Sequence, residues 1–397
     1  MKADNARDIV RRLHEAGYEA YLVGGCVRDM VLGLEPTDYD IATSARPEQV
    51  MGLFTRTEPI GARFGVVLVI QRGIPFEVAT FRSDEAYLDG RRPTGVVFTN
   101  AKEDVLRRDF TINGLLYDPL GDRVIDFVEG QKDIRSKTVR AIGNPKERFT
   151  EDKLRILRAV RFGARLGYTI EPETWNAVRE MAPDIVQVSQ ERIRDELVRI
   201  LTEGQAAHGV RLLVESGLAE AILPEWSWNE RVETMLDLMK TPVEAAFAMA
   251  VLLHECPPDD VSGIVERLRF SNRESAHVET LVRGQRRFAD VGLMSTAALK
   301  RFLRIDRFED HLELYRLKCV AGRTSLEILE LVRDKVREWS SGDLAPPPLI
   351  SGEDLINMGF VPGPSFRQIL DAVEDEQLEG RLTERASALA FVRSRFV

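Results

Sequence analysis

The stretch YLVGGCVRDMVLGLEPTDYDIAT, residues 21–43, decides how the rest of the chain is organised. A short apolar run is interrupted by a pair of glycines, and a basic residue, Arg28, follows within one turn. Asp38 and Asp40 then precede a second apolar run. Alternate side chains of a strand share one face, so a strand from Asp38 would place both carboxylates on the same side, about 7 Å apart.

These residue types suit one kind of chemistry when they occur together. Gly24 and Gly25 let the backbone approach a phosphate closely, and the turn after them can begin a helix whose N–H groups face an anion. Two carboxylates repel each other unless a cation joins them, and hard oxygen ligands suit Mg²⁺ bridged to substrate phosphates. Each motif alone is usually an ordinary turn. Together they favour a metal-assisted phosphoryl or nucleotidyl transfer site with Asp38 and Asp40 as metal ligands.

The composition excludes several classes of protein. The 397 residues are 44% hydrophobic, enough for two to four domains, and no run of 18 apolar residues predicts a membrane span. A net charge of −9 argues against nonspecific coating of nucleic acid, although a local basic groove stays compatible with it. The three cysteines have neither metal nor disulfide spacing, and the charged N-terminus has no apolar signal core, so we expect a cytoplasmic protein.

The first third of the chain mixes helix and strand signals. Helical spacing predicts helices over 4–17 and 47–54, and two β-rich runs around Arg72-Gly73 predict a hairpin over 64–82. Glu77 lies in the second run, either as a third catalytic carboxylate beside the Asp pair or as a salt-bridge partner. The polar segment 83–100 predicts a long loop, and long loops in compact domains are often functional.

Two later segments carry clusters of polar residues. Residues 101–117 predict a helix whose polar members include Arg108, Asp109 and Asn113, and these side chains could bind phosphates and ribose hydroxyls. Residues 150–166 predict an amphipathic helix that begins with Thr150 as its N-cap. Its polar side carries a ladder at intervals of three residues: Asp152, Arg155, Arg158 and Arg161.

The ladder suggests how a nucleotide base would be chosen. Asp152 accepts hydrogen bonds and Arg155 donates them. Cytosine and adenine each present an amino donor beside a ring-nitrogen acceptor, whereas guanine and uracil present the reverse order. Because guanine or uracil would leave buried polar groups unpaired, the pair would reject these two bases by ~10⁴-fold. The pair would select C and A without a template if it faces a nucleotide; otherwise the segment is a helix with surface arginines.

Beyond residue 137 the strand signals fade and helices dominate. The predicted helices cover 173–182, 189–203, 206–216, 229–240, 242–254, 260–269, 273–289, 295–304, 307–320 and 324–338. A proline-stiffened linker spans 340–350, and a small helical module follows it.

Four motifs occur in the order that is typical of a known family: LVGGCVRDMVLG (22–33), Asp38-Tyr39-Asp40, RRDFTIN (107–113) and Glu151-Asp152-x-x-Arg155. They resemble the class II tRNA nucleotidyltransferases, which include the CCA-adding enzymes and the bacterial poly(A) polymerases. The resemblance is continuous over 18–170. It is weaker over 171–225, where SQERI (189–193) resembles a further neck helix of the family.

The resemblance implies an α+β protein: a nucleotidyltransferase head with a mixed sheet (1–137), then an all-helical neck (138–225), body (226–340) and tail (341–397). It implies Mg²⁺ at Asp38 and Asp40 and base reading by Asp152 and Arg155. Triphosphate and ribose contacts would come from Gly24, Gly25, Arg28, Arg108, Asp109, Asn113, Arg158 and Arg161. The 83–100 segment resembles the loop linked in this family to the switch from C to A addition. The body and tail would hold the tRNA acceptor and T arm.

The reaction implied by the resemblance is attack of an RNA 3′-hydroxyl on the α-phosphate of CTP or ATP. Full CCA addition by a monomer or homodimer is the expected activity. The alternatives are addition of only the terminal A or only CC, poly(A) synthesis, and a non-catalytic RNA-binding protein. The loop argues against CC-only addition and the acidic composition against poly(A) synthesis.

Overall fold

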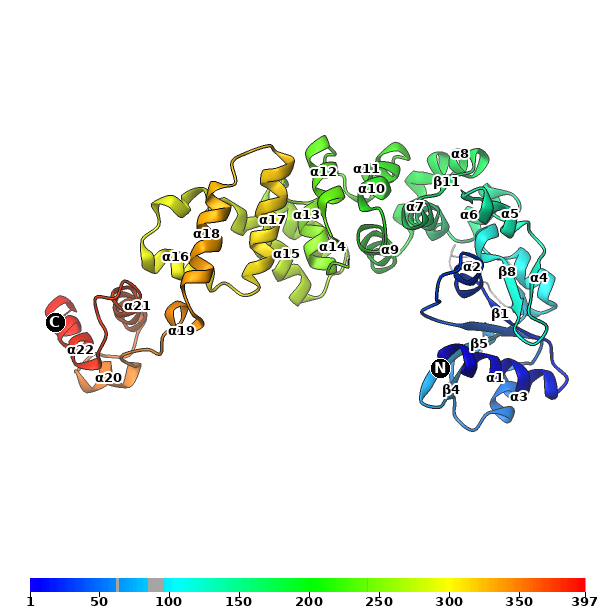
Figure 1. Cartoon of the computed structure of the whole chain (residues 1–397), viewed down its shortest axis with the longest axis horizontal. Helices are drawn as coiled ribbons and strands as arrows, with labels where there is room; N and C mark the ends of the chain where they lie inside the picture. The colour runs from blue at the N-terminus through cyan, green and yellow to red at the C-terminus, as the bar shows by residue number, and fades with distance from the viewer. Residues whose placement is uncertain (62–63, 85–95, 241, 397) are drawn as a thin grey trace. The chain divides into compact units, whose positions relative to one another are not determined.

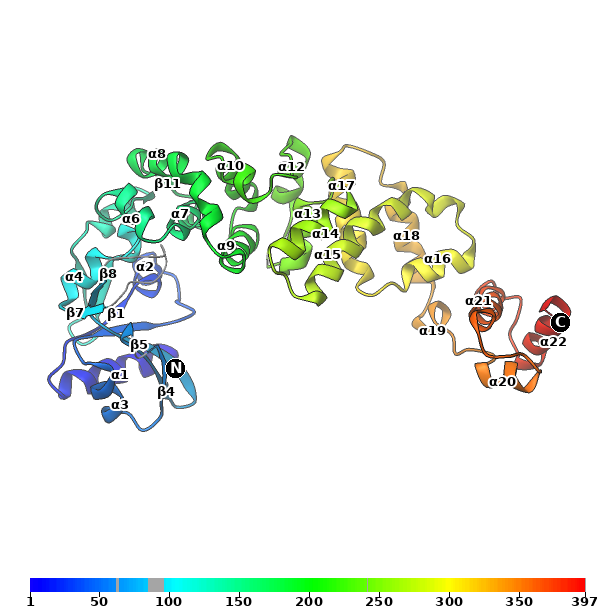
Figure 2. The same ribbon diagram turned by 180° about the vertical axis from the view of Figure 1, so that it is seen from behind.

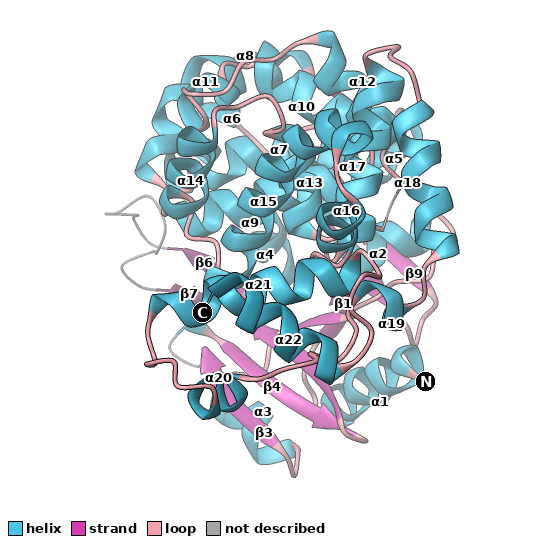
Figure 3. Cartoon of the chain, turned by 90° about the vertical axis from the view of Figure 1, so that its left-hand side faces the viewer, coloured by secondary structure: helices cyan, strands magenta, loops and turns pink. Residues whose placement is uncertain are grey.

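The computed structural model describes residues 1–61, 64–84, 96–240 and 242–396, which form two compact units. The first comprises Met1–Trp228 with Ile264–Phe270, and the second comprises Asn229–Gly263 with Ser271–Val397. The expected α+β class is confirmed, because a mixed seven-stranded sheet lies in the N-terminal part and helices make up most of the rest (Figure 3). The finer division into head, neck, body and tail stays a prediction.

The sheet has the strand order β3-β4-β5-β2-β1-β8-β9. Its central strand is β2, which is parallel to β5 and antiparallel to β1, and β1 is in turn antiparallel to β8. The predicted hairpin is confirmed as β4 and β5, joined at Arg72 and Gly73, both of which have positive φ. The strands are β1 (Ala20–Val23), β2 (Asp40–Thr43), β3 (Thr57–Gly61), β4 (Val66–Gln71), β5 (Ile74–Thr80), β8 (Leu115–Asp118) and β9 (Arg123–Asp126).

Helices pack on this sheet as their apolar spacing predicts. The first helix, α1 (Lys2–Glu15), buries Ile9, Val10 and Leu13 and packs on β1, and α3 (Pro47–Leu53) packs beside it on β4 (Figure 1). A separate buried cluster joins α4 (Ala101–Leu106) to the sheet through Val105 and its neighbours. The short helix α2 (Gly25–Val31) lies against β1 and β8 at the start of the motif that organises the chain.

The predicted helix over 101–117 is wrong. The chain forms α4, then a 3₁₀ turn at Thr111–Asn113, and then strand β8, which pairs with β1. Helix α4 ends at Leu106, and Phe110, whose N–H donates to the Asp109 carboxylate, adopts an extended conformation and bridges to Ala141. The helical periodicity of the apolar residues hid a strand that only its pairing with the rest of the sheet reveals.

The helix predicted over 150–166 also begins elsewhere. Thr150 lies inside α6 (Pro145–Glu151), where its hydroxyl donates to Lys146 O, so it is not an N-cap. The helical conformation is interrupted at Asp152, whose carboxylate accepts from Leu154 N, and α7 (Leu154–Leu166) follows. The break places Asp152 outside the helix that carries the three arginines.

The flanks of the 83–100 segment are a pair of short antiparallel strands, β6 (Arg82–Asp84) and β7 (Val96–Phe98). Residues 85–95, on which the predicted loop centres, lie outside the described residues. Of the remaining short elements, α5 (Gly130–Arg135) follows β9, and β10 (Thr138–Val139) pairs with β11 (Thr169–Ile170).

All the helices predicted after residue 170 are present, with ends that differ by a few residues. They are α8 (Pro172–Met181), α9 (Gln190–Thr202), α10 (Ala206–Glu215), α12 (Glu230–Leu238), α13 (Ala245–Leu252), α14 (Pro258–Arg267), α15 (Asn272–Gly284), α16 (Thr296–Leu303), α17 (Phe308–Ala321) and α18 (Glu327–Glu338). The short helix α11 (Leu218–Ile222) was not predicted. Helix α7 packs on both α9 and α10 (Figure 2). Among the described residues, no helix is long and apolar enough to cross a membrane.

The C-terminal helices of the second unit contact α16 through ion pairs and a hydrogen bond. The C-terminal helices are α19 (Ser341–Leu344), α20 (Gly352–Asn357), α21 (Pro364–Leu378) and α22 (Arg385–Phe396). Arg301 of α16 forms ion pairs with Glu374 and Asp375 of α21. Lys300 donates to Leu378 O at 2.9 Å, which satisfies a carbonyl at the end of α21.

Gly130 offers a test of how tightly the first unit is packed around the 3₁₀ turn. An added Cβ would lie 2.2 Å from the backbone oxygen of Thr111, so Gly130→Ala forces the backbone to move. We expect a loss of about 3 kcal/mol in unfolding free energy, measured by urea denaturation. Gly52→Ala is the matched control, because that Cβ meets no atom within 4 Å on helix α3 and should stabilise by about 0.5–1 kcal/mol. Equal effects of the two substitutions would contradict this packing.

Candidate active site

The glycine pair builds a turn that only glycine fits easily. Gly24 has φ +75° and ψ −133°, and a Cβ at this position would lie 3.4 Å from Nη1 of Arg108. The turn opens α2 with Gly24 as its N-cap, and glycine has no side chain with which to cap the helix. Arg28, one turn along α2, is 2% exposed. Its Nη1 donates to Asn113 Oδ1 at 2.8 Å and its Nη2 donates to Asp29 Oδ1 at 2.7 Å, so the guanidinium is fixed.

The two aspartates lie at the start of β2, but not in the predicted strand geometry. Asp40 is the first strand residue, whereas Asp38 precedes the strand and its side chain is 84% exposed. Lys2 from α1 donates to Asp38 Oδ1 at 3.2 Å, so a cation already lies beside this carboxylate. The sequence predicted a strand from Asp38 that would hold both carboxylates on one side. Because the strand begins at Asp40, its pleat does not fix the side chain of Asp38.

The carboxylate of Asp40 lies close to the charged side chains of Glu77 and Arg108. Glu77 on β5 is its neighbour, since Ile41 pairs with Val78 in the parallel ladder. Desolvation by the packed surroundings and the negative charge of Glu77 raise the pKa of Asp40 to about 6, and Arg108 opposes them. Among the described residues, no group of three or more His, Cys, Asp and Glu side chains could hold a metal ion. The carboxylates at this end of β2 are those of Asp38 and Asp40, and Glu77 lies beside Asp40 on the neighbouring strand.

A chain of buried hydrogen bonds runs from the glycine turn to α7. Asn113 connects Arg28 to Asp109, because its Nδ2 donates to Asp109 Oδ1 at 3.4 Å. Arg158 Nε donates to the other oxygen, Oδ2, at 2.8 Å. Burial alone would raise the pKa of Asp109, but the ion pair with Arg158 outweighs it and lowers that pKa to about 2. The structure thus brings together four residues that the sequence placed in one site.

The ladder on α7 continues into a carboxylate that the sequence did not single out. Glu196 of α9 is buried and lies 2.7 Å from Arg161 Nε and 3.9 Å from Arg158 Nη1. Burial lowers the pKa of Arg161 to about 10, even though Glu196 opposes it. These arginines therefore face carboxylates inside the protein and are not a solvated helix face.

Asp152 and Arg155 are both held by neighbours. Arg192 of α9 forms a two-pronged ion pair with Asp152, with Nη1–Oδ1 at 3.2 Å and Nη2–Oδ2 at 2.8 Å. Arg155 is 9% exposed and donates to Glu151 Oε2 at 2.7 Å and to Arg107 O at 3.0 Å. Oδ1 of Asp152 also accepts from Leu154 N, whereas Oδ2 keeps a lone pair for a further donor. The partnership with Arg192 joins residues 40 positions apart, and no local spacing predicts it.

Asp104 is a second residue that the sequence analysis missed. It is buried on α4 and binds two consecutive arginines: Arg107 Nη2 lies 2.7 Å from Oδ1, and Arg108 Nη2 lies 3.0 Å from Oδ2. Its Oδ1 also accepts from Arg82 N at 3.2 Å. Here a signal existed, because the i, i+3 and i, i+4 spacing of one acid and two bases predicts ion pairs on a helix.

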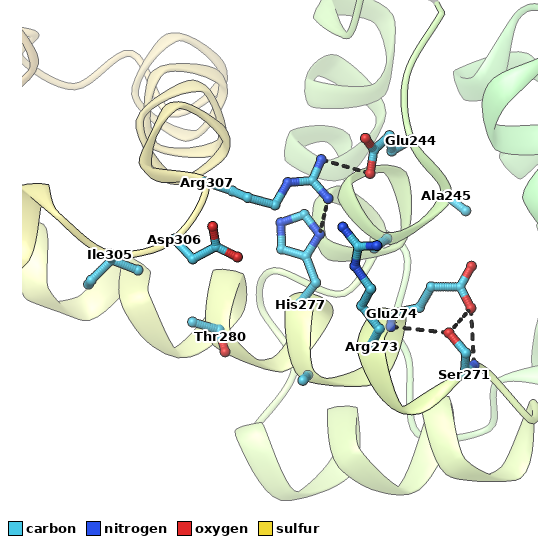
Figure 4. A pocket seen from close by; sticks show the side chains of 12 residues that line it. Glu244, Ala245, Ser271, Arg273, Glu274, His277, Thr280, Ile305, Asp306 and Arg307 are labelled. Atoms are coloured by element: carbon cyan, nitrogen blue, oxygen red, sulfur yellow. Dashed lines mark hydrogen bonds and ion pairs between the residues drawn. The ribbon is translucent and has the colours of Figure 1, made fainter.

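A cavity of about 720 Å³ in the second unit is a different kind of site (Figure 4). Arg307 lies in it and contacts Glu244 Oε2 at 2.7 Å and His277 Nδ1 at 3.2 Å. Because arginine only donates, His277 Nδ1 must accept, and its Nε2–H therefore faces Asp310 Oδ2 at 3.1 Å. Burial and Arg307 lower the pKa of His277, which keeps it neutral. These charges are satisfied by one another.

Comparison with known proteins agrees with this geometry. Residues 20–140 match the family model of the poly A polymerase head domain, and residues 167–229 match a model described as the probable RNA and SrmB-binding site of polymerase A. The fold and the site are thus those of a nucleotidyltransferase with a poly(A)-polymerase-type head.

Similar proteins of known name show to which family of nucleotidyltransferases the chain belongs. A CCA-adding enzyme of Levilactobacillus brevis is 32% identical over 97% of this chain and 96% of its own length. The CCA-adding enzyme of Limosilactobacillus reuteri is 42% identical over 54% of this chain and 53% of its own length. The chain belongs to the family of CCA-adding enzymes.

Solved structures share the architecture. A crystal structure of the Bacillus stearothermophilus CCA-adding enzyme in complex with CTP is 28% identical, covers 99% of this chain and 98% of its own, and has a TM-score of 0.83. A Thermotoga maritima CCA-adding enzyme complexed with tRNA has the same fold at 18% identity, with a TM-score of 0.69 and coverage of 99% and 95%.

The two-pronged contact between Arg192 and Asp152 leads to a prediction. Arg192→Ala removes the partner that orients this carboxylate, so we expect affinity for CTP and ATP to fall about tenfold, measured by isothermal titration. Arg199→Ala on the same helix is the control, because Arg199 is half-exposed and its ion pair with Glu203 is long, at 3.8 Å. Unchanged nucleotide affinity in Arg192→Ala would show that Asp152 does not need this partner.

Proposed function

We propose that the protein adds C and A residues to the 3′ end of tRNA, using CTP and ATP and no template. The observation that carries this proposal is the Asp152–Arg155 pair, held rigidly by Arg192, Glu151 and a backbone carbonyl. A rigid acceptor beside a rigid donor matches the amino and ring-nitrogen edge shared by cytosine and adenine. The names of the curated relatives support the same activity.

The triphosphate would bind at the glycine turn. The first N–H groups of α2 and the guanidiniums of Arg28 and Arg108 are suitable partners for phosphate oxygens. Asn113 and Asp109 would bind the ribose hydroxyls or orient Arg28. Arg158 and Arg161 would act mainly by holding Asp109 and Glu196 in place, since their strongest contacts are with these carboxylates.

A divalent metal fits the donor set at the start of β2, and Mg²⁺ is our proposal because only oxygen ligands are present. Asp38 and Asp40 would hold it; desolvation and then the charge of Glu77 on the neighbouring strand raise the pKa of Asp40, and a bound cation would oppose both effects. When bound, the metal would neutralise charge on the phosphates and favour ionisation of the attacking hydroxyl.

The chemistry then needs only positioning. The RNA 3′-hydroxyl attacks the α-phosphate in line, a new phosphodiester bond forms, and pyrophosphate leaves with the electrons of the broken bond. Arg28 and Arg108 would stabilise charge on the transferring and leaving groups. No side chain is needed as a covalent nucleophile.

Other parts of the chain would serve the RNA. We propose that the helices of the second unit hold the tRNA acceptor and T arm. Arg273 of α15, whose side chain lies in the cavity of Figure 4, makes no ion pair or hydrogen bond within the described residues, so its charge is available to a phosphate. A cytoplasmic location and a monomeric or homodimeric state are part of this proposal.

The decisive assay offers CTP, ATP, GTP and UTP separately to tRNAs that lack three, one or none of the terminal CCA nucleotides. We expect C on the first substrate, A on the second and nothing on the third. Incorporation of A but never C would favour A-only addition, C without A would favour CC-only addition, and long A tails would favour poly(A) synthesis.

The carboxylates at β2 give a prediction that separates an enzyme from a non-catalytic RNA-binding protein. Asp38→Asn and Asp40→Asn should each lower the rate of incorporation by at least about 10³-fold, because each removes one of two metal ligands. Binding of tRNA, measured by filter binding, should stay within twofold. Near-normal incorporation in both variants would exclude this metal site.

Asp152 gives a prediction about base choice. Asp152→Asn replaces a carboxylate, which only accepts hydrogen bonds, by an amide that both donates and accepts. Residue 152 could then also bind the carbonyl that uracil presents in place of the amino group of cytosine, so it would no longer reject uracil. We expect the ratio of kcat/KM for CTP over UTP to fall at least tenfold. Glu147→Gln, an exposed change of the same chemical type on α6, should leave the ratio unaltered. An unchanged ratio in Asp152→Asn would contradict base reading by this residue.

A further inference from the structure

One aromatic ring in the first unit lies against three guanidiniums. Phe162 of α7 is 4% exposed, and the Cζ atoms of Arg161, Arg158 and Arg28 lie 4.3, 5.4 and 5.6 Å from its centroid. Within the part of the chain that the structure describes, no other ring has cation–π contacts with three cations. Two of the arginines belong to the same helix as Phe162, but Arg28 comes from α2, at the glycine turn.

The surroundings of Arg28 show what the ring contributes. Asn113 and Asp29 bind the edge of the guanidinium through its N–H groups. The Arg28 Cζ lies over the face of the Phe162 ring, and the attraction between a cation and a ring face adds a restraint on this guanidinium that its hydrogen bonds do not supply. Phe110 packs edge-on against Phe162, with 5.6 Å between centroids and 75° between planes, and fixes the ring in turn.

The ring also connects the two ends of the proposed nucleotide site. Of the residues that would read the base, Asp152 lies just before α7 and Arg155 lies in its first turn, and Arg28 lies where the triphosphate would bind. The hydrogen-bonded path between them passes through Asp109 and Asn113, and Phe162 provides a second, shorter path from α7 to α2. A leucine would fill much of the same space but could not attract a cation.

We propose that Phe162 is a positioning residue that holds the Arg28 guanidinium at the phosphate end of the site from the base-reading helix. This inference rests on the proposed function, because it takes Arg28 as a triphosphate ligand. It implies that loss of the ring weakens recognition of the triphosphate while recognition of the nucleoside stays intact.

The test compares Phe162→Leu with the wild-type chain in tRNA extension, using CTP as substrate and cytidine as a competitive inhibitor. We expect KM for CTP to rise about tenfold, as loss of a desolvated cation–π contact implies, while the inhibition constant of cytidine changes less than twofold. The preference for CTP over UTP should stay unaltered. Phe162→Tyr, which retains the ring, should restore most of the affinity for CTP.

Phe149→Leu on α6 is the matched control, because Phe149 is fully buried and has no cation–π contact within the described residues. It should cost similar stability and leave both constants unchanged. Equal weakening of CTP and cytidine by Phe162→Leu, failure of Phe162→Tyr to restore CTP affinity, or a wild-type KM in Phe162→Leu would each overturn the inference. If the wild-type chain itself incorporates no nucleotide, the proposed function fails instead.

Discussion

The partly buried ion pair between Asp109 and Arg158 fixes the arrangement of the candidate site in the first unit. It joins the turn after α4 to α7, the helix that carries Arg155, Arg158 and Arg161. Removing one member would leave the other charge without its partner in a partly desolvated position, which destabilises the first unit. Burial raises the pKa of Asp109, but the ion pair with Arg158 lowers it to about 2, so this carboxylate is ionised at neutral pH.

This constraint explains why the reaction and the choice of nucleotide can reside in different elements of one chain. The carboxylates that would serve the reaction, Asp38 and Asp40, lie at the start of the central strand β2, whereas the residues that would read the base lie at the start of α7, Asp152 just before the helix and Arg155 in its first turn. The ion pair, together with Asn113, keeps these elements in a fixed relation. A protein can select a base without a template only when its acceptor and donor are fixed relative to the phosphate site.

The sequence predicted most of what is local. Helix α1, the hairpin at Arg72 and the later helices follow from apolar spacing and turn residues, and the motifs brought Arg28, Asp109 and Asn113 to one site. It failed where long-range pairing decides the conformation: Leu115–Asp118 reads as the end of a helix but completes the sheet beside β1. It also missed Arg192 and Glu196, because residues of α9 reach the site through the packing of α9 against α7.

A crystal structure of this chain with Mg²⁺ and a non-hydrolysable CTP analogue would test most directly whether one bound nucleotide is held for reaction at β2 and read at Asp152. We expect Asp38 and Asp40 to ligate the metal. In the same complex, we expect hydrogen bonds from cytosine N4 to Asp152 and from Arg155 to cytosine N3. A triphosphate bound at the glycine turn with its base pointing away from Asp152 would contradict this expectation.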